Sequence, residues 1–189
     1  MHRSILILSI IAILSGLGLL IISLPIPFEK NEIPVTFGDG QNAVLTITTP
    51  KYLRLGDASS IQLLVTLNPE KTTEPLRSVK LKSNLVTTQL EISPTDAVTA
   101  IIAENGIAEF RWEVSAHEDE EQRATIWCFT QGSNGLELIL ARDVTIPVKT
   151  ILNMRFSLAR WILGEVILLC LLLIAVTVHR SRKRKLFFD

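Results

Sequence analysis

The chain has 189 residues, and its 19 basic and 19 acidic side chains balance, so it lacks the basic excess typical of nucleic-acid-binding proteins. The length accommodates one domain with additional segments. Two cysteines, Cys128 and Cys170, are too few for the disulfide framework of a small secreted domain. Hydrophobic residues reach 48% and gather near both ends of the chain, a pattern that indicates membrane segments.

The first expected element is an apolar helix. Residues 4–24, SILILSIIAILSGLGLLIISL, carry no charged side chain. A helix of this length is roughly 31 Å long, close to the thickness of a hydrocarbon core. The run is longer than the apolar part of a typical secretory signal, and no A-x-A pattern follows it. We therefore expect an uncleaved signal anchor that crosses the membrane, with cleavage after the run as the alternative.

Residues 25–155 are expected to form an all-β domain. Apolar and polar residues alternate with a period of two in several runs, as in strands with one buried face. The expected inward rows are Ile61, Leu63, Val65 and Leu67; Ala108, Phe110, Trp112 and Val114; and Val144, Ile146 and Val148. Further strands are expected at residues 43–48, 51–55, 78–82, 86–92, 97–103, 123–130 and 136–141.

Eight to ten short strands without a helix favour an antiparallel immunoglobulin-like β-sandwich, although the Cys…Trp…Cys pattern of true immunoglobulin domains is absent. Turn residues separate the strands. Asn105-Gly106 is a strong hairpin signal, because both turn positions favour positive φ. The run GSNG at residues 132–135 is expected to form a similar turn.

A second membrane helix is expected at residues 156–179. A basic tail, residues 180–189, follows it, and positive charge marks the cytoplasmic side of a membrane helix. Residues 1–3 contain Arg3 and are expected to be cytoplasmic too. The segment 25–155 is then extracytoplasmic; it has 12 basic and 17 acidic residues, a net charge of −5, and a role in nucleic-acid binding is excluded.

Small residues predict where the helices make contact. Ser9, Ala12, Gly16 and Ser23 share one face of the first helix. In the second helix Gly164 and Ala175 share a face. Small side chains let helices approach closely in lipid, so we expect the two helices to pack together or against a partner. The alternative is the ordinary composition of membrane helices.

Glu165 interrupts the second apolar run four residues after Trp161, at a depth of roughly 6 Å if Trp161 marks the interface. It is either a tolerated interfacial carboxylate or a contact to a third helix of a partner. The basic tail serves as an orientation signal or also binds anionic lipids. The candidate lipid contacts are Arg180, Arg182, Lys183, Arg184 and Lys185.

The densest ionisable cluster is HEDEE, residues 117–121, which is either a solvated turn or a weak site for a divalent cation. Cys128 lies in an alternating run, and we expect a buried apolar side chain, with an intermolecular disulfide as the alternative. The chain lacks G-x-S-x-G, H-E-x-x-H and phosphate-binding glycine motifs. We therefore expect no catalytic residues, no cofactor and no metal.

These patterns predict a non-catalytic, membrane-anchored binding or accessory subunit that acts at the outer surface through its β-sandwich. Its expected partners are membrane lipids and another membrane protein. The alternative is a sensor that binds a ligand outside and signals to a cytoplasmic partner; an enzyme is disfavoured.

Overall fold

The structure is a computed structural model that describes residues 2–37, 41–67, 79–102, 106–132, 135–151 and 154–185. The chain forms two compact units. One unit consists of Met1–Pro25 together with Met154–Asp189, and the other is Ile26–Asn153.

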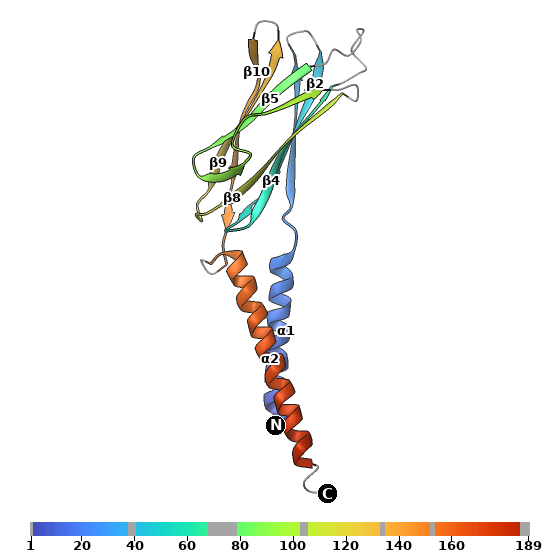
Figure 1. Cartoon of the computed structure of the whole chain (residues 1–189), viewed down its shortest axis with the longest axis vertical. Helices are drawn as coiled ribbons and strands as arrows, with labels where there is room; N and C mark the ends of the chain where they lie inside the picture. Colours follow the sequence, from blue (N-terminus) through green and yellow to red (C-terminus); the bar gives the residue numbers. More distant parts are fainter. Residues whose placement is uncertain are drawn as a thin grey trace. The chain divides into compact units, whose positions relative to one another are not determined.

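The first unit is a pair of helices, α1 (His2–Ser23) and α2 (Phe156–Lys185). They lie side by side and antiparallel, so both chain termini are at the same end of the pair (Figure 1). The stretches Ile5–Ser23 and Phe156–His179, of 19 and 24 residues, are long and apolar enough to cross a membrane. Few of their side chains are buried, and the rest are exposed or partly buried, as expected for helices that require lipid or a protein partner around them.

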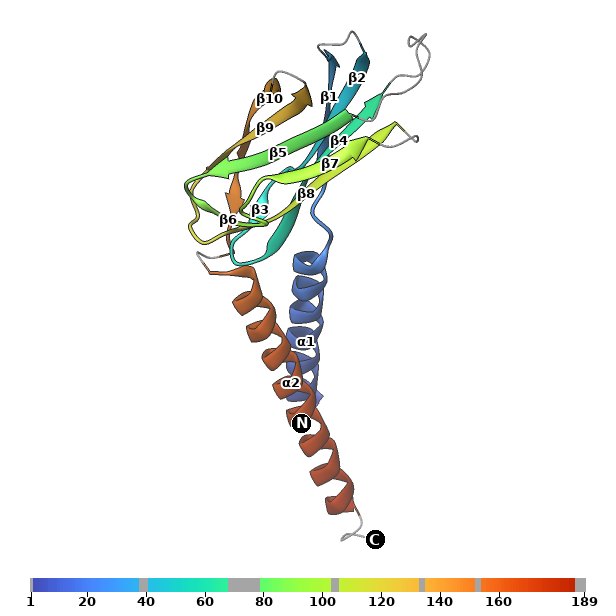
Figure 2. The same ribbon diagram turned by 45° about the horizontal axis from the view of Figure 1, so that its top comes forward.

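The second unit contains eleven strands within the described residues (Figure 2). A five-stranded sheet has the order β1-β2-β4-β8-β6, a four-stranded sheet has the order β10-β9-β5-β7, and β11 pairs with β3 in parallel. The strands are β1 Phe28–Thr36, β2 Asn42–Pro50, β3 Leu53–Arg54, β4 Ala58–Leu67, β5 Val79–Thr87, β6 Leu90–Ser93, β7 Val98–Ile102, β8 Ile107–Ala116, β9 Gln122–Gly132, β10 Gly135–Ile146 and β11 Val148–Lys149. Every pairing within the two larger sheets is antiparallel.

The two larger sheets enclose one hydrophobic core. The pairing of β4 with β8 places Ile61 opposite Trp112 and Leu63 opposite Phe110. All four side chains are buried, and the rings of Phe110 and Trp112 stack with their centroids 6.3 Å apart. The rows expected along β4 and β8 are confirmed in full. The third row is confirmed in part, because Ile146 is buried while Val144 and Val148 are only partly buried.

The hairpin expected at Asn105-Gly106 is wrong. The strands on either side, β7 and β8, belong to different sheets and do not pair with each other. Asn105 lies outside the described residues. Gly106 has a φ of +69°, and its carbonyl accepts a hydrogen bond from Leu67 N at 2.8 Å, which starts the pairing of β8 with β4. The hairpin expected at residues 132–135 is confirmed, because β9 and β10 pair across it; residues 133 and 134 lie outside the described residues.

Strand β1 was not expected from the sequence. Only Ile33 and Val35 pack against the core, so the alternation is too short to recognise, and Pro34 fits because β1 is an edge strand. Other boundaries also differ from expectation. The strand expected at residues 86–92 is wrong, because its start belongs to β5, which ends at Thr87, and its end to β6 in the other sheet. Residues 136–146 belong to one strand, β10, with an irregularity between Leu138 and Leu140.

We expect Trp112→Ala to lower the free energy of unfolding of the segment 26–153 by about 3–5 kcal/mol, because it removes a fully buried ring. The matched control is Arg111→Ala on the solvent side of the same strand, which should change stability by about 0.5 kcal/mol or less. Chemical denaturation measures both variants. A loss below about 1 kcal/mol for Trp112→Ala would contradict the assigned core.

Candidate functional site

The outward side of β9 carries two aromatic residues. Buried and less buried residues alternate along this strand, with Ile126 and Cys128 facing the core and Trp127 and Phe129 facing outward. The rings of Trp127 and Phe129 stack, with 6.3 Å between centroids and 7° between planes. Two stacked aromatic rings on the solvent side of an antiparallel sheet are unusual, because that side is normally polar.

Strand β10 extends this apolar surface. Leu138 lies directly opposite Phe129, and Leu136 lies opposite Gln131, so both leucines project from the same side as the aromatic pair. Leu136 is 54% exposed and Leu138 is 49% exposed. We call the surface formed by Trp127, Phe129, Leu136 and Leu138 the Trp127 face. Exposed apolar patches that include aromatic residues are typical of protein interaction sites.

Polar groups border the Trp127 face on two sides. On β5, Lys82 lies opposite Phe129, and Lys80 projects from the same side of the sheet. Toward the other end of β10, Thr125 Oγ1 donates a hydrogen bond of 2.7 Å to Asp143 Oδ1. The two lysines give the β5 border a positive charge, whereas Asp143 is already paired.

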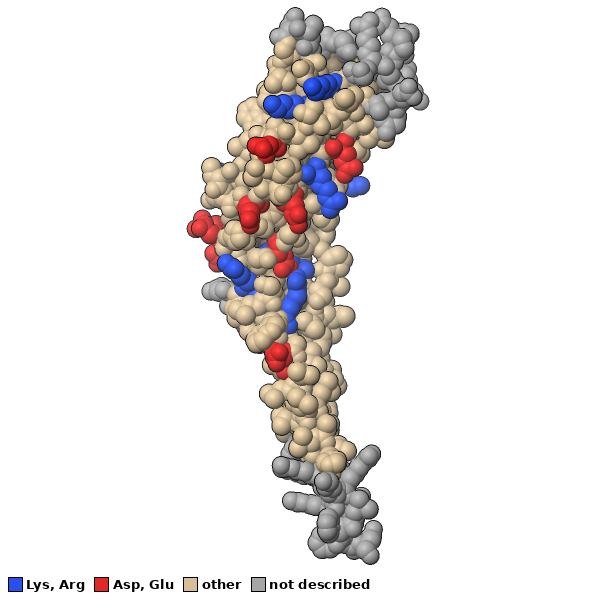
Figure 3. All heavy atoms as spheres, in the orientation of Figure 1, with Lys and Arg blue, Asp and Glu red and all other residues tan. Residues whose placement is uncertain are grey.

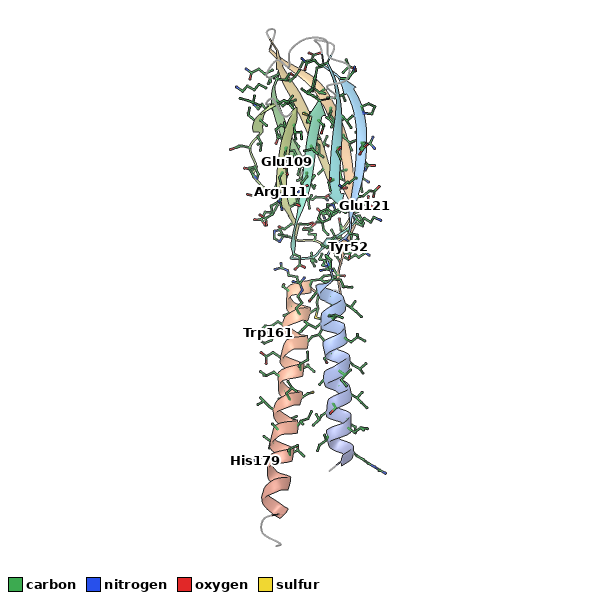
Figure 4. The ribbon with its side chains drawn as sticks, turned by 90° about the vertical axis from the view of Figure 1, so that its right-hand side faces the viewer. Tyr52, Glu109, Arg111, Glu121, Trp161 and His179 are labelled. Carbon is green, nitrogen blue, oxygen red and sulfur yellow. The ribbon has the colours of Figure 1, made fainter. Side chains whose placement is uncertain are left out.

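The opposite sheet presents a different outer surface. Along β8, Glu109, Arg111 and Glu113 alternate with the buried row, and Figure 4 shows Glu109 and Arg111 close together on this strand. Charged side chains are scattered over the view of the β-sheet unit in Figure 3, while the helices show almost only uncharged atoms. The Trp127 face groups two stacked aromatic rings with two exposed leucines on one outer surface; Phe28, Val86, Ile101 and Ile107 are further exposed apolar side chains among the described residues of this unit.

The sequence indicates the Trp127 face only when the alternation along β9 is combined with the pairing of β9 with β10. The alternation in residues 123–130 predicts a strand, and it also predicts that one of its two sides carries Trp127 and Phe129. Both sides contain apolar residues, so the pattern alone does not say which one is outward. Leu138 joins the face only through the register of β9 with β10.

The acidic run 117–121 forms a turn after β8. His117 Nε2 lies 2.9 Å from Glu91 Oε2, and Ser115 Oγ donates a 3.1 Å hydrogen bond to the same oxygen. The hydrogen bond from His117, followed by that from Ser115, lowers the pKa of Glu91. Within the described residues, no three His, Cys, Asp or Glu side chains converge in a way that could hold a metal ion.

Cys128 is a buried free cysteine, as one of the two sequence alternatives predicts. Burial raises the pKa of its thiol to about 12. A thiol with this pKa stays protonated at neutral pH and is a poor nucleophile. Its burial also leaves no access for an intermolecular disulfide.

Most of the small residues expected at a helix contact do not lie against the other helix of the pair. No heavy atom lies within 4 Å of the position of a Cβ on Gly16 or Gly164, and Ser23 and Ala175 are exposed. Ala12 and Ser9 are partly buried, and the Ser9 hydroxyl donates to the carbonyl of Ile5 at 2.9 Å. The expected small residues therefore contribute little to the α1–α2 contact, and their contact with a partner stays a prediction.

Gly18, which the sequence reasoning missed, provides the close approach. A Cβ at this position would lie 3.6 Å from Leu163 Cδ1 of α2. Cys170 is buried on the same side of α2. The interrupting carboxylate, Glu165, is exposed. Residues 180–185 form the last turns of α2, and their side chains, like all of residues 186–189, lie outside what the structure describes.

Comparison with known proteins identifies no family. No protein-family model matches the chain, and no curated protein matches it. A chain in the complex of Zinc 2-glycoprotein with prolactin-inducible protein from human seminal plasma is 12% identical, with 67% of this chain and 98% of that chain covered and a TM-score of 0.42. A cohesin module of a Clostridium perfringens family 33 glycoside hydrolase is 6% identical, with 63% and 100% covered and a TM-score of 0.35. A conjugative transposon lipoprotein from Bacteroides eggerthii is 12% identical, with 64% and 96% covered and a TM-score of 0.30.

We expect His117→Ala to raise the pKa of Glu91 part of the way back to its ordinary value, because the histidine donor is lost and the Ser115 donor remains. Since a lowered carboxyl pKa stabilises the fold above the unfolded pKa, this contribution disappears as the pH falls through the folded pKa. NMR titration of the Glu91 carboxyl carbon measures the shift, with Glu118→Ala as the control. An unchanged Glu91 titration in His117→Ala would show that the pair does not form.

Proposed function

We propose that this protein is a two-span membrane protein whose extracytoplasmic β-sandwich binds the outer part of another membrane protein through the Trp127 face. The single observation that carries the proposal is this exposed apolar surface on a domain joined to two apolar helices. The sandwich is proposed to be immunoglobulin-like; the antiparallel sheets, with β4 and β8 central in one and β9 and β5 central in the other, support that arrangement.

The helices support the membrane topology. Both are long enough to cross, and their exposed surfaces consist almost entirely of leucine, isoleucine and valine, which lipid solvates better than water does. Both termini lie at the same end of the helix pair (Figure 1). The basic residues after His179 support a cytoplasmic position for that end, and the segment between the helices is then proposed to be extracytoplasmic.

The chemistry of the partner follows from the surface and its border. An apolar area on the partner would cover Trp127, Phe129 and the two leucines, because burial removes their apolar surface from water. Acidic side chains beside that area would face Lys80 and Lys82. Docking onto the face is favoured over strand addition at the β10 edge, because the irregularity between Leu138 and Leu140 interrupts that edge.

The role is proposed to be accessory and without catalysis. The histidine of the β-sheet unit pairs with Glu91, and the cysteine of that unit is buried and protonated at neutral pH. Neither arrangement provides a nucleophile next to a base, which acyl-transfer chemistry requires.

Leu138→Lys should abolish association with the native membrane partner, because it introduces a charge into the apolar centre of the contact. The expected loss is at least tenfold in the amount of partner recovered after mild detergent extraction, measured by quantitative mass spectrometry. Leu138 is half exposed, so the melting temperature of the segment 26–153 should change little.

Leu64→Lys is the matched control, because Leu64 lies on the outward side of the other sheet, between Thr46 and Glu109. It introduces the same charge and should retain the partner. Equal recovery with both variants, or equal loss, would contradict the proposal that the Trp127 face is the binding surface.

A further inference from the structure

Glu165 lies on the side of α2 that faces away from α1. The contact side of α2 is marked by Leu163, which approaches Gly18, and by buried Cys170. At 100° per residue, Glu165 is about 160° from Leu163 and about 140° from Cys170 around the helix. Helix α1 therefore does not cover it, and the exposed position of Glu165 agrees with this geometry.

Large apolar side chains surround Glu165 on this side. Trp161, Leu169 and Leu172 lie within about 40° of it around the helix and are 65%, 59% and 55% exposed. Figure 4 shows Trp161 projecting away from α1. The neighbouring Gly164 has open space at its Cβ position, so the backbone beside Glu165 is accessible to another helix.

No cation pairs with this carboxylate among the residues that the structure describes. Within the described residues Glu165 makes no hydrogen bond or ion pair. Residues 4–24 contain no charged residue, and Glu165 is the only charged residue in residues 161–178. A second copy of this chain packed in parallel would bring another Glu165, and its residues 161–178 would bring no lysine or arginine at that depth, so a different protein is the better source of the cation.

A carboxylate inside an apolar helix is unfavourable in lipid unless it meets a polar or charged partner. We infer that Glu165 binds a lysine or arginine on a transmembrane helix of a different protein, about one helical turn inside the outer end of that helix. This inference rests on the proposed function, because it assumes that α2 crosses the membrane. It names a second contact with the partner, within the membrane and separate from the Trp127 face.

A designed helix tests the charge pairing directly. The full chain, labelled with a donor fluorophore, is reconstituted in phosphatidylcholine vesicles with an acceptor-labelled leucine-alanine transmembrane peptide. One peptide carries a single lysine one turn inside its outer end, and its twin carries leucine there. Energy transfer should show that the lysine peptide associates at least fivefold more tightly than its twin with the unmodified chain.

The variants separate charge from packing. Glu165→Leu should reduce the lysine preference to about one, and Glu165→Gln should lower it at least threefold, because the amide keeps a hydrogen-bond acceptor but loses the charge. Leu172→Ala, on the same side of α2, should keep the full preference. Equal association of both peptides with the unmodified chain, or a preference that survives in Glu165→Leu or fully in Glu165→Gln, would overturn the inference.

The peptide experiment and the Leu138→Lys experiment can fail independently of each other. A lysine preference that depends on Glu165 supports the inference even if Leu138→Lys leaves the native partner bound. If the preference is absent while Leu138→Lys releases the native partner, the Trp127 face stands and Glu165 is a carboxylate that the membrane interface tolerates.

Discussion

The register of β4 against β8 is the constraint on which the β-sheet unit depends. It sets Ile61, Leu63 and Val65 opposite Trp112, Phe110 and Ala108, so that both strands bury their rows on the same side. A slip of one residue would turn one of these rows toward solvent. The pairing also places the charged residues of β8 on the outside and provides the buried surface against which β5 and β9 pack.

The unit thereby covers most of its apolar surface but not all of it. The inward side of β9 completes the core, and its outward side carries the partly buried rings of Trp127 and Phe129. Helices α1 and α2 also leave apolar surface uncovered, because each helix covers only one side of the other. The proposed function accounts for both kinds of surface, because it puts the helices in lipid and the Trp127 face against a protein. Glu165 is the only charged residue in residues 161–178, and Trp127 and Phe129 are a stacked aromatic pair on the outward side of a sheet.

Much of the fold was predictable because alternation is a local property. The rows along β4 and β8 follow from spacing alone, and so do the two apolar helices. Pairing between strands is not local, which is why Asn105-Gly106 predicted a hairpin where the chain crosses between sheets. The same limit applies to the candidate site. Trp127 and Leu138 are joined only by the β9–β10 register, and Gly18 rather than Gly16 meets α2 because helix rotation depends on the packing of larger side chains such as Leu163.

We propose that the chain retains both helices and that the β-sheet unit, which lies between them in the sequence, is outside the cell membrane. The most direct measurement places an epitope at each end of the full chain and adds protease to intact cells. We expect both epitopes to survive and residues 4–24 to remain in the mature chain. A mature chain that begins near Phe28, or an end that protease removes from intact cells, would contradict this proposal.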